Sequence, residues 1–258
     1  MYLLDIEDKF KDIMTKTDFR VSIFGSARIH PGEENYNLIS DLSYKLGLED
    51  ITLITGGGAG LMEAASLGHK KARKTLNRQD DPIINIGLNI KLPFEEYASL
   101  HLDIKKQFER FSERLEYFMQ LSNAVIVSVG GIGTLLEFFF SWQLIQVKHI
   151  SEFPIILYAP DNRYQELMNW ITEWLLTYNL INVNDLDYIY IVKDVEQVLS
   201  ILKEFKQTKE VKGNLFSLSI NSKKEGNNFH NYIEYINDVV LKYNINDKAS
   251  FKDHLNNQ

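Results

Sequence analysis

Continuous apolar runs alternate with amphipathic stretches along most of the chain. The runs cover residues 20–24, 51–55, 83–88, 124–127, 154–158 and 188–192. Strands that are apolar throughout, rather than at every second position, are typical of a parallel sheet covered by helices on both faces. The pattern therefore predicts an α/β fold with a doubly wound, mostly parallel, Rossmann-like sheet.

Helical spacing of apolar residues fills the intervals between the predicted strands. Helices are expected over residues 36–46, 61–73, 105–121, 134–148 and 164–178, and again from Asp194. In the third of these, Phe108, Phe111, Leu115 and Phe118 form one apolar stripe, and the preceding residues 89–103 are expected to form a loop. Asp194 and Gln197 have the spacing of a capping box.

The character of the chain changes near both ends. Residues 1–18 are expected to form a short N-terminal helix, and residues 19–205 the Rossmann-like nucleotide-binding catalytic domain. From residue 206 the chain is rich in Lys and Asn, and a segment at 232–243 has helical spacing. Residues 206–258 are therefore assigned as a C-terminal helical extension.

Composition and charge exclude several classes of function. The formal net charge of −7 argues against a nucleic-acid-binding surface, where a basic face is expected. Cysteine is absent, so disulfides and thiol nucleophiles are excluded. No apolar run approaches the length of a membrane span, and the acidic start of the chain is unlike a secretory signal. We therefore expect a cytoplasmic protein with neither a membrane nor a nucleic-acid partner.

Three glycine-bearing segments follow predicted strands, at residues 25–27, 56–60 and 130–133. Because the carboxyl ends of parallel strands meet at one edge of a sheet, these loops are expected to cluster and to line a ligand site. The third leads into a helix, whose free N–H groups and partial positive charge favour an anion. Neither a triphosphate P-loop nor the dinucleotide fingerprint is present, so the loops favour one phosphate or a mononucleotide.

Glu137 and Arg114 are candidate catalytic residues, and each has a structural alternative. Thr134 and Glu137 also have the spacing of a capping box, in which the carboxylate only closes the helix start. Arg114 lies among acidic neighbours with which a solvated arginine would pair. The six histidines are scattered without metal-ligand spacing, so no metal site is expected.

Four motifs together resemble the LONELY GUY family, whose members were long labelled lysine decarboxylases. They are TGGGAGLMEAA (55–65), IGLNIKLP (86–93), FERFSER (108–114) and GGIGTLLE (130–137), in the family's order and spacing. The resemblance covers roughly residues 19–200. It implies a usually dimeric phosphoribohydrolase, which cleaves the N-glycosidic bond of AMP-like or cytokinin-type nucleoside 5′-monophosphates to a free base and ribose 5-phosphate, without a metal or redox cofactor.

The family motif Pro-Gly-Gly-x-Gly-Thr-x-x-Glu assigns roles to individual residues. Its glycines, threonine and glutamate match Gly130, Gly131, Gly133, Thr134 and Glu137, and the arginine of the family's Arg-Lys pair matches Arg114. The resemblance implies a phosphate on the glycine turn and Glu137 beside the ribose. Ser26, Gly57 and Gly58 would line the ribose or phosphate side of the same site.

Two positions depart from the family motif. Val129 replaces its proline, and Leu115 replaces the lysine after the arginine. The second change removes a cation, which leaves open an alternative to the hydrolase: a weakly catalytic or non-catalytic nucleotide sensor or cofactor carrier on the same fold. A lysine decarboxylase is disfavoured, because no residues resemble a pyridoxal phosphate lysine site.

The helix after Glu137 is apolar on nearly every side, with three consecutive phenylalanines at residues 138–140 followed by Trp142. Such a helix is buried in the core or against another subunit. We therefore expect a homodimer.

Overall fold

Seven parallel strands form one sheet in the order β4-β3-β2-β1-β5-β6-β7. The computed structural model describes residues 18–78, 84–91 and 99–211. The strands are β1 (Phe19–Phe24), β2 (Ile51–Thr55), β3 (Asn85–Ile90), β4 (Ile104–Phe108), β5 (Ala124–Val127), β6 (Ile155–Tyr158) and β7 (Ile189–Val192). β1, β2, β5 and β6 are buried at every position, as their continuous apolar sequences predict.

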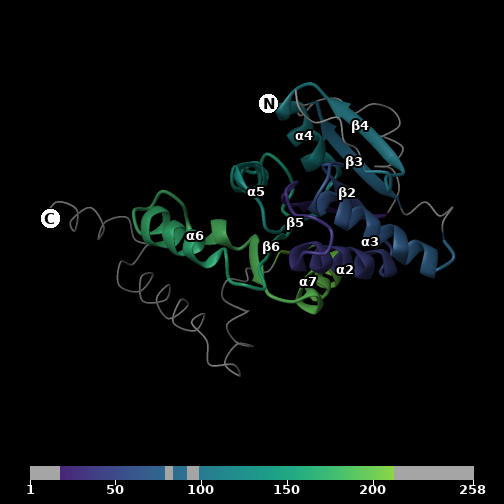
Figure 1. The fold of residues 1–258 in the computed structure, drawn as a ribbon. Coiled ribbons are helices and arrows are strands. Elements are labelled where there is room, and N and C mark those ends of the chain that lie inside the picture. Colours follow the sequence, from purple (N-terminus) through teal and green to yellow (C-terminus); the bar gives the residue numbers. More distant parts are fainter. Residues whose placement is uncertain (1–17, 79–83, 92–98, 212–258) are drawn as a thin grey trace, which may run out of the picture.

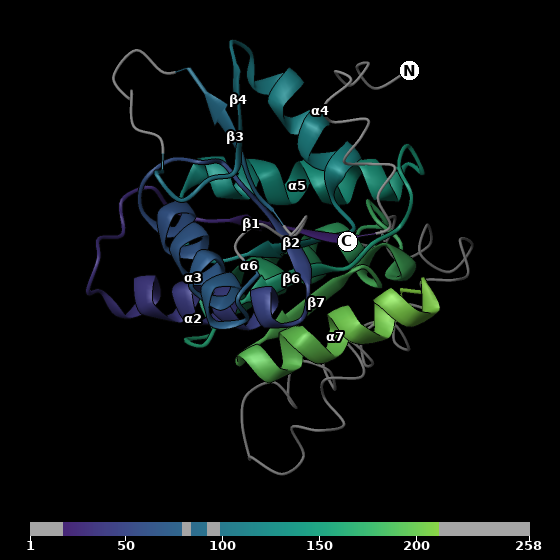
Figure 2. The same ribbon diagram turned by 90° about the vertical axis from the view of Figure 1, so that its right-hand side faces the viewer.

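Helices cover both faces of the sheet (Figures 1 and 2). They are α2 (Glu34–Leu48), α3 (Leu61–Thr75), α4 (Phe111–Leu121), α5 (Ile132–Gln146), α6 (Gln165–Trp170) and α7 (Val195–Thr208). α2, α3 and α7 lie on one side, where Lys45 of α2 pairs with Glu196 of α7. α4 and α5 lie on the other side (Figure 2), so the predicted doubly wound α/β fold is confirmed.

β1 lies at the point where the strand order reverses. It pairs with β2 on one side and with β5 on the other, both in parallel. The chain after β1 runs to one edge of the sheet through β2, β3 and β4, and then returns to build the other half from β5. In open α/β sheets ligands bind outside the carboxyl ends of strands at such a reversal.

The sequence prediction was wrong between residues 89 and 110. The expected loop begins later, because β3 continues to Ile90, and the expected helix at 105–121 is divided into β4 and α4. β4 is an edge strand that pairs with β3 from Ile104 to Phe108. Its central residues are Lys105, Lys106 and Gln107, and such polar residues are typical of an edge strand rather than of a buried parallel one.

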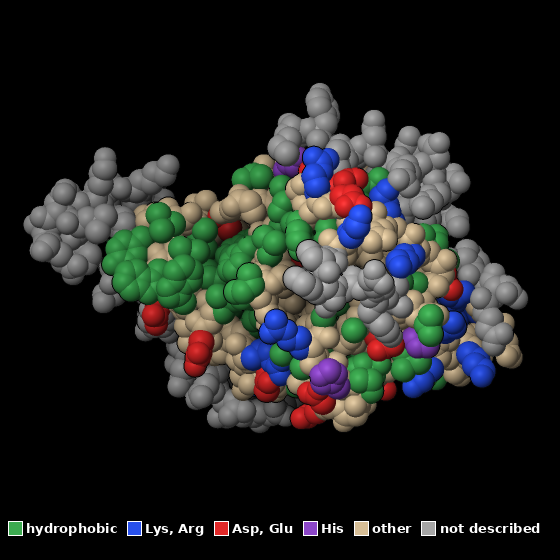
Figure 3. All heavy atoms as spheres, turned by 45° about the horizontal axis from the view of Figure 1, so that its top comes forward, with side chains coloured by type: hydrophobic (Ala, Val, Ile, Leu, Met, Phe, Trp, Pro, Cys, Tyr) green, Lys and Arg blue, Asp and Glu red, His purple; other side chains and the backbone are tan. Residues whose placement is uncertain are grey.

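Within the single chain α5 is buried on one side only, whereas the sequence predicts burial in the core or against another subunit. Phe138, Trp142 and Ile145 face the core. A stripe on the opposite side stays exposed, formed by Ile132, Leu136, Phe139 and Val147. A second exposed apolar group, Trp170, Trp174, Tyr178 and Leu180, lies on and just after α6, which continues as a π-helical turn, η1 (Ile171–Leu176). Figure 3 shows hydrophobic side chains gathered on the side of the molecule where α6 lies in Figure 1.

The last elements follow prediction closely. A short 3-10 turn, η2 (Val183–Leu186), precedes β7. Asp194 is the N-cap of α7 and accepts a hydrogen bond from the backbone N–H of Gln197 at 2.8 Å. In the described parts of the chain, no helix is long and apolar enough to cross a membrane. The predicted N-terminal helix and the C-terminal extension after residue 211 lie outside the described residues.

Candidate functional site

The loops that follow β1, β2 and β5 meet at the carboxyl edge of the sheet. The backbone N–H of Ser26, after β1, donates to the carbonyl of Val129, after β5, at 2.9 Å. The Ser26 carbonyl accepts from the N–H of Leu61, the first residue of α3, also at 2.9 Å. The three glycine-bearing loops therefore form one continuous rim, as the sequence predicts.

The glycine turn after β5 presents open backbone at the start of α5. Gly131 is the N-cap of α5 and offers no side-chain cap, so the first helical N–H groups remain available to a ligand. A Cβ added at Gly131 or at Gly133 would have no atom within 4 Å, whereas one at Gly130 would overlap the Thr134 side chain. Gly131 and Gly133 thus border free space, while Gly130 makes room for the buried Thr134.

Glu137 projects from the second turn of α5 and forms an ion pair with Arg114 of α4. Arg114 Nη1 lies 3.0 Å from Glu137 Oε1, and only 9% and 11% of the two side chains are exposed. The Arg114 Nε also donates to the carbonyl of Leu88 in β3 at 2.6 Å. The guanidinium stacks over the Phe118 ring at 4.9 Å, as a cation–π contact. One arginine thus connects α4, β3 and α5.

The alternative explanations of both residues from local sequence are wrong. Thr134 is the third residue of α5 and not its N-cap, so Glu137 lies too far along the helix to close the helix start. Arg114 is buried and does not act as a solvated surface arginine. The two side chains meet from positions 23 residues apart, which only tertiary structure brings together.

Burial dominates the protonation of this pair. It raises the pKa of Glu137 above its usual range, although the nearby Arg114 acts in the opposite direction. Desolvation likewise lowers the pKa of Arg114, although Glu137 opposes it. Burial therefore favours the neutral form of Glu137 more than exposure to water would, which is the direction in which the pKa values of general acids are shifted.

The loop after β2 approaches the same pair from the other side. Gly56 packs against Arg114, because a Cβ at this position would overlap the guanidinium. Gly57 has a φ of +69°, which favours glycine, and an added Cβ there would also overlap Asn89 Oδ1. Gly58 lies next to Met62. Gly57 and Gly58 therefore line the side of the rim nearest to β3.

Two further sequence positions adopt structural roles. The Ser26 hydroxyl accepts from the backbone N–H of Arg28 at 3.1 Å, as in a local turn, so it is the backbone of Ser26 that joins the loops. Leu115, which stands where the family motif has lysine, is buried with 5% of its surface exposed. No cation replaces that lysine at this position.

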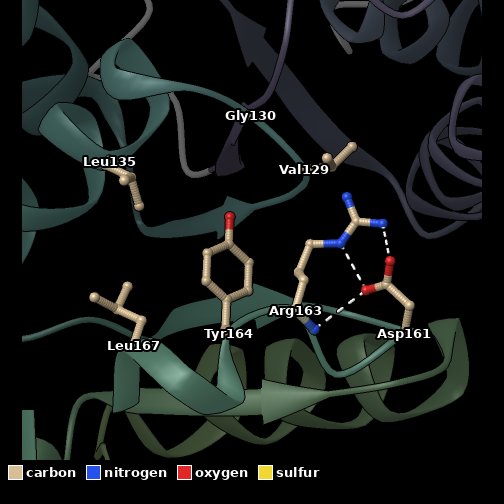
Figure 4. Close-up of a pocket in the computed structure, with 7 residues that line it drawn as sticks. All are labelled: Val129, Gly130, Leu135, Asp161, Arg163, Tyr164 and Leu167. Carbon is tan, nitrogen blue, oxygen red and sulfur yellow. Dashed lines mark hydrogen bonds and ion pairs between the residues drawn. The ribbon is translucent and has the colours of Figure 1, made fainter. Parts of the chain in front are cut away.

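An open pocket of about 470 Å³ lies on the opposite side of the glycine turn, between α5 and α6 (Figure 4). Its lining residues are Val129, Gly130, Leu135, Asp161, Arg163, Tyr164 and Leu167. The Tyr164 hydroxyl donates to the carbonyl of Ser128, and burial raises its pKa to about 12, so it remains a donor at neutral pH. Sequence reasoning missed Tyr164 and Arg163, and their position just after β6 was the available signal.

Metal-binding side chains are not clustered in the part of the chain that the structure describes. Within residues 18–78, 84–91 and 99–211, no group of three or more His, Asp or Glu side chains is placed to hold an ion.

Comparison with solved structures gives the same fold. A molybdenum cofactor binding protein from the phototrophic bacterium Rippkaea orientalis is 24% identical, with a TM-score of 0.53 over 73% of this chain and 97% of the other. The protein TM1055 is 17% identical, with a TM-score of 0.53 over 72% and 99% of the two chains. The molybdenum cofactor carrier protein of Chlamydomonas reinhardtii is 18% identical, with a TM-score of 0.50 over 72% and 97%. At these identities the likeness concerns the fold alone.

Sequence comparison identifies the family. No curated protein matches the chain significantly. A family model described as "Possible lysine decarboxylase" matches residues 62–202, which is more than half of the chain and includes most of α3, Arg114 and the glycine turn with Glu137. With its Rossmann-like sheet and its Gly130–Thr134–Glu137 motif, the chain therefore belongs to this family, the LONELY GUY family.

Proposed function

We propose that this protein is a phosphoribohydrolase of nucleoside 5′-monophosphates, with AMP the first substrate to test. The observation that carries the proposal is the buried Arg114–Glu137 pair, 3.0 Å apart, beside an open helix start. In this proposal the pair supplies an acid–base group and the helix start binds an anion, and both are needed to cleave a phosphorylated nucleoside. Family membership supports the reaction class.

The phosphate would bind to the backbone N–H groups of residues 131–134 and to the Thr134 hydroxyl. Gly131 and Gly133 leave the space that such a group needs. The dipole of α5, a helix of 15 residues, favours an anion at this end. The ribose would then lie over the first two turns of α5, toward Glu137.

Glu137 would act on the ribose as the glycosidic bond breaks. The bond between C1′ and the base nitrogen lengthens, and positive charge develops on the sugar as in other glycoside cleavages. An ionised Glu137 stabilises that charge and orients the water that attacks C1′. The water supplies the new C1′ hydroxyl, its proton goes to the departing base, and ribose 5-phosphate remains. Arg114 keeps Glu137 in place through its bonds to Leu88 and Glu137.

Release of adenine and ribose 5-phosphate from AMP tests this proposal. Replacing Glu137→Gln should reduce turnover about 10²–10⁴-fold, the usual contribution of a general acid or base. Glu113→Gln is the matched control, because Glu113 lies one residue from Arg114 and pairs only loosely with Arg110, at 4.0 Å. Failure of the wild-type protein to release base from any purine or pyrimidine monophosphate would refute hydrolysis.

A carrier or sensor function is the second candidate, and a specific observation favours it. Leu115 is buried where the family motif has a lysine, so the site lacks one cation. The structural relatives from Rippkaea orientalis and Chlamydomonas reinhardtii are described as molybdenum cofactor binding or carrier proteins. This function would give a ligand-dependent rise in melting temperature without turnover. Hydrolysis gained by Leu115→Lys would then indicate that the missing cation limits catalysis.

The exposed stripe of α5 is the proposed contact between two copies of the chain. Ile132 is 82% exposed, and Leu136 and Phe139 follow it at helical spacing. Exposed apolar stripes of this kind mark protein contacts. Sedimentation should therefore show a dimer that Leu136→Glu dissociates, whereas Ser200→Glu, at an exposed position of α7 on the other side of the sheet, should not.

A further inference from the structure

The pocket between α5 and α6 is separate from the Arg114–Glu137 pair. Leu135 lines the pocket, whereas Glu137 faces α4. Two residues along a helix correspond to about 200° of rotation, so these side chains leave α5 on nearly opposite sides. Val129 and Gly130 of the glycine turn line the pocket, whereas Arg114 and Glu137 do not. A single sugar phosphate bound over Glu137 would leave the pocket unoccupied.

The walls of the pocket suit a flat, apolar molecule. Leu135 and Leu167 lie on one side of the Tyr164 ring, and Arg163 lies on the other with Val129 above it (Figure 4). The volume of about 470 Å³ is in the range of small-molecule sites. An aromatic ring could pack against the Tyr164 ring in such a site.

The polar end of the pocket is an arginine–aspartate pair with unused capacity. Arg163 donates through Nε to Asp161 Oδ1 at 2.6 Å and through Nη2 to Asp161 Oδ2. Nη2 also donates to Asn35 at 3.2 Å. Among the described residues Nη1 has no partner, and Figure 4 shows the corresponding nitrogen directed toward the turn at Val129. The site thus offers the two N–H donors of Nη1 beside a carboxylate acceptor.

The Arg163–Asp161 pair favours a neutral ligand over an anionic one. Asp161 neutralises the guanidinium and adds its own exposed oxygens, so a second phosphate or carboxylate would meet a carboxylate at short range. A neutral ring avoids this repulsion. A carbonyl or ring nitrogen could accept from Arg163 Nη1, and an adjacent N–H could donate to Asp161.

We propose that the pocket is a second ligand site, which binds a neutral planar heteroaromatic ring with adjacent acceptor and donor groups, of the purine or pyrimidine base class. The geometry of the pocket supports this site whether or not the protein hydrolyses nucleotides. The ring packs on Tyr164 and contacts the glycine turn at Val129 and Gly130. A free base bound there touches the same turn that would hold the phosphate on its other side.

Isothermal titration of the full chain with adenine, hypoxanthine and uracil tests the site. At least one base should bind saturably at one per chain. Leu167→Trp, which fills the pocket, should weaken that binding at least tenfold, and Glu137→Gln should leave it within twofold. If Leu167→Trp fails to fold, as judged by its melting curve, Arg163→Gln replaces it and should weaken binding at least threefold.

The outcomes separate this proposal from the hydrolase. Binding of a base with no hydrolysis of any monophosphate would support the pocket and refute the enzyme. Hydrolysis with no saturable binding of any of the three bases would refute the pocket alone. Binding that is lost in Glu137→Gln but retained in Leu167→Trp would place the base on the Glu137 side and overturn the proposal.

Discussion

Two arginine–carboxylate pairs flank the start of α5, and they differ in their exposure to water. Arg114 and Glu137 are nearly enclosed, with 9% and 11% of their side chains exposed. Arg163 and Asp161 form the same kind of pair on the other side of the glycine turn, with 22% and 53% exposed. The chemical groups are equivalent, and only the surroundings differ.

Pairing with arginine lowers the pKa of the carboxyl group in both pairs, but for Glu137 the effect of burial is larger. Hydrogen bonds from Arg163 lower the pKa of Asp161, because the charged form remains hydrated. Desolvation raises the pKa of Glu137 despite the adjacent arginine. The exposed pair therefore favours the charged form of its carboxyl group, whereas enclosure favours the neutral form of Glu137.

Replacing the arginine of each pair should give the largest difference between them, measured as the loss of unfolding free energy. Arg114→Met should lower the free energy of unfolding by about 3–5 kcal/mol, because Glu137 is left buried without its counter-charge. Arg163→Met should cost no more than about 1 kcal/mol, as for exposed pairs. Urea denaturation at pH 7 measures both values.

A double variant provides the control for this prediction. Arg114→Met combined with Glu137→Leu removes both buried charges and should recover most of the lost stability. Equal losses of unfolding free energy for Arg114→Met and Arg163→Met would show that burial does not distinguish the two pairs.

The glycines of the turn should respond oppositely to an added methyl group. Gly130→Ala should destabilise the protein by about 1–3 kcal/mol, because the new Cβ overlaps both Oγ1 and Cβ of Thr134. Gly133→Ala lies in open space in the first turn of α5 and should stabilise the helix by up to about 1 kcal/mol. Melting temperatures measured without ligand test both changes.

The same Gly133→Ala variant tests the proposed phosphate site. Its methyl group would stand in front of the free N–H groups, so AMP should raise the melting temperature of the variant less than that of the wild type. An unchanged AMP response would show that the phosphate does not bind at this turn.

The smallest expected effect concerns pH: the contributions of Glu137 and Asp161 to stability should change in opposite directions as the pH rises. A carboxyl group whose folded-state pKa is raised binds more protons in the folded protein, so the contribution of Glu137 decreases as the pH rises from 4.5 through that pKa. The pKa of Asp161 is lowered, so its contribution is present above pH 3.8 and is lost as the pH falls through the folded-state value.

Unfolding free energies between pH 3 and pH 8 test this contrast. Glu137→Gln should gain stability relative to wild type with rising pH. Asp161→Asn should lose relative stability over the same direction, by less than about 1 kcal/mol because the group is exposed. If the two variants showed the same dependence on pH, the opposite pKa shifts of Glu137 and Asp161 would be contradicted.

The α/β architecture could be predicted from the sequence, because buried parallel strands have continuous apolar sequences. β1, β2, β5 and β6 were all recognisable on that basis. β4 was not recognisable, because it is an edge strand that pairs with β3 on one side only, and its residues Lys105, Lys106 and Gln107 interrupt the apolar pattern. An edge strand receives its structure from hydrogen bonding with its neighbour, which a single sequence does not display.

For the candidate site, sequence motifs located the glycine turn and named Arg114 and Glu137. Spacing alone favoured a helix cap for Glu137, and the contact with Arg114 was visible only once α4 and α5 were packed together. Arg163 and Tyr164 follow β6 without any glycine or motif to mark them. Their relevance depends on parallel strands ending at one edge, and it appears only in three dimensions.

The carbonyl groups of the glycine turn are held at two neighbouring residues by distant parts of the chain. Ser26 after β1 secures Val129, and Tyr164 before α6 secures Ser128. A turn fixed in this way is already shaped before any ligand arrives, so association would lose little conformational entropy. Affinity for a phosphate at this turn would then be adjustable from α6, since weakening the hydrogen bond of Tyr164 would make the turn more flexible without altering any atom that contacts the phosphate.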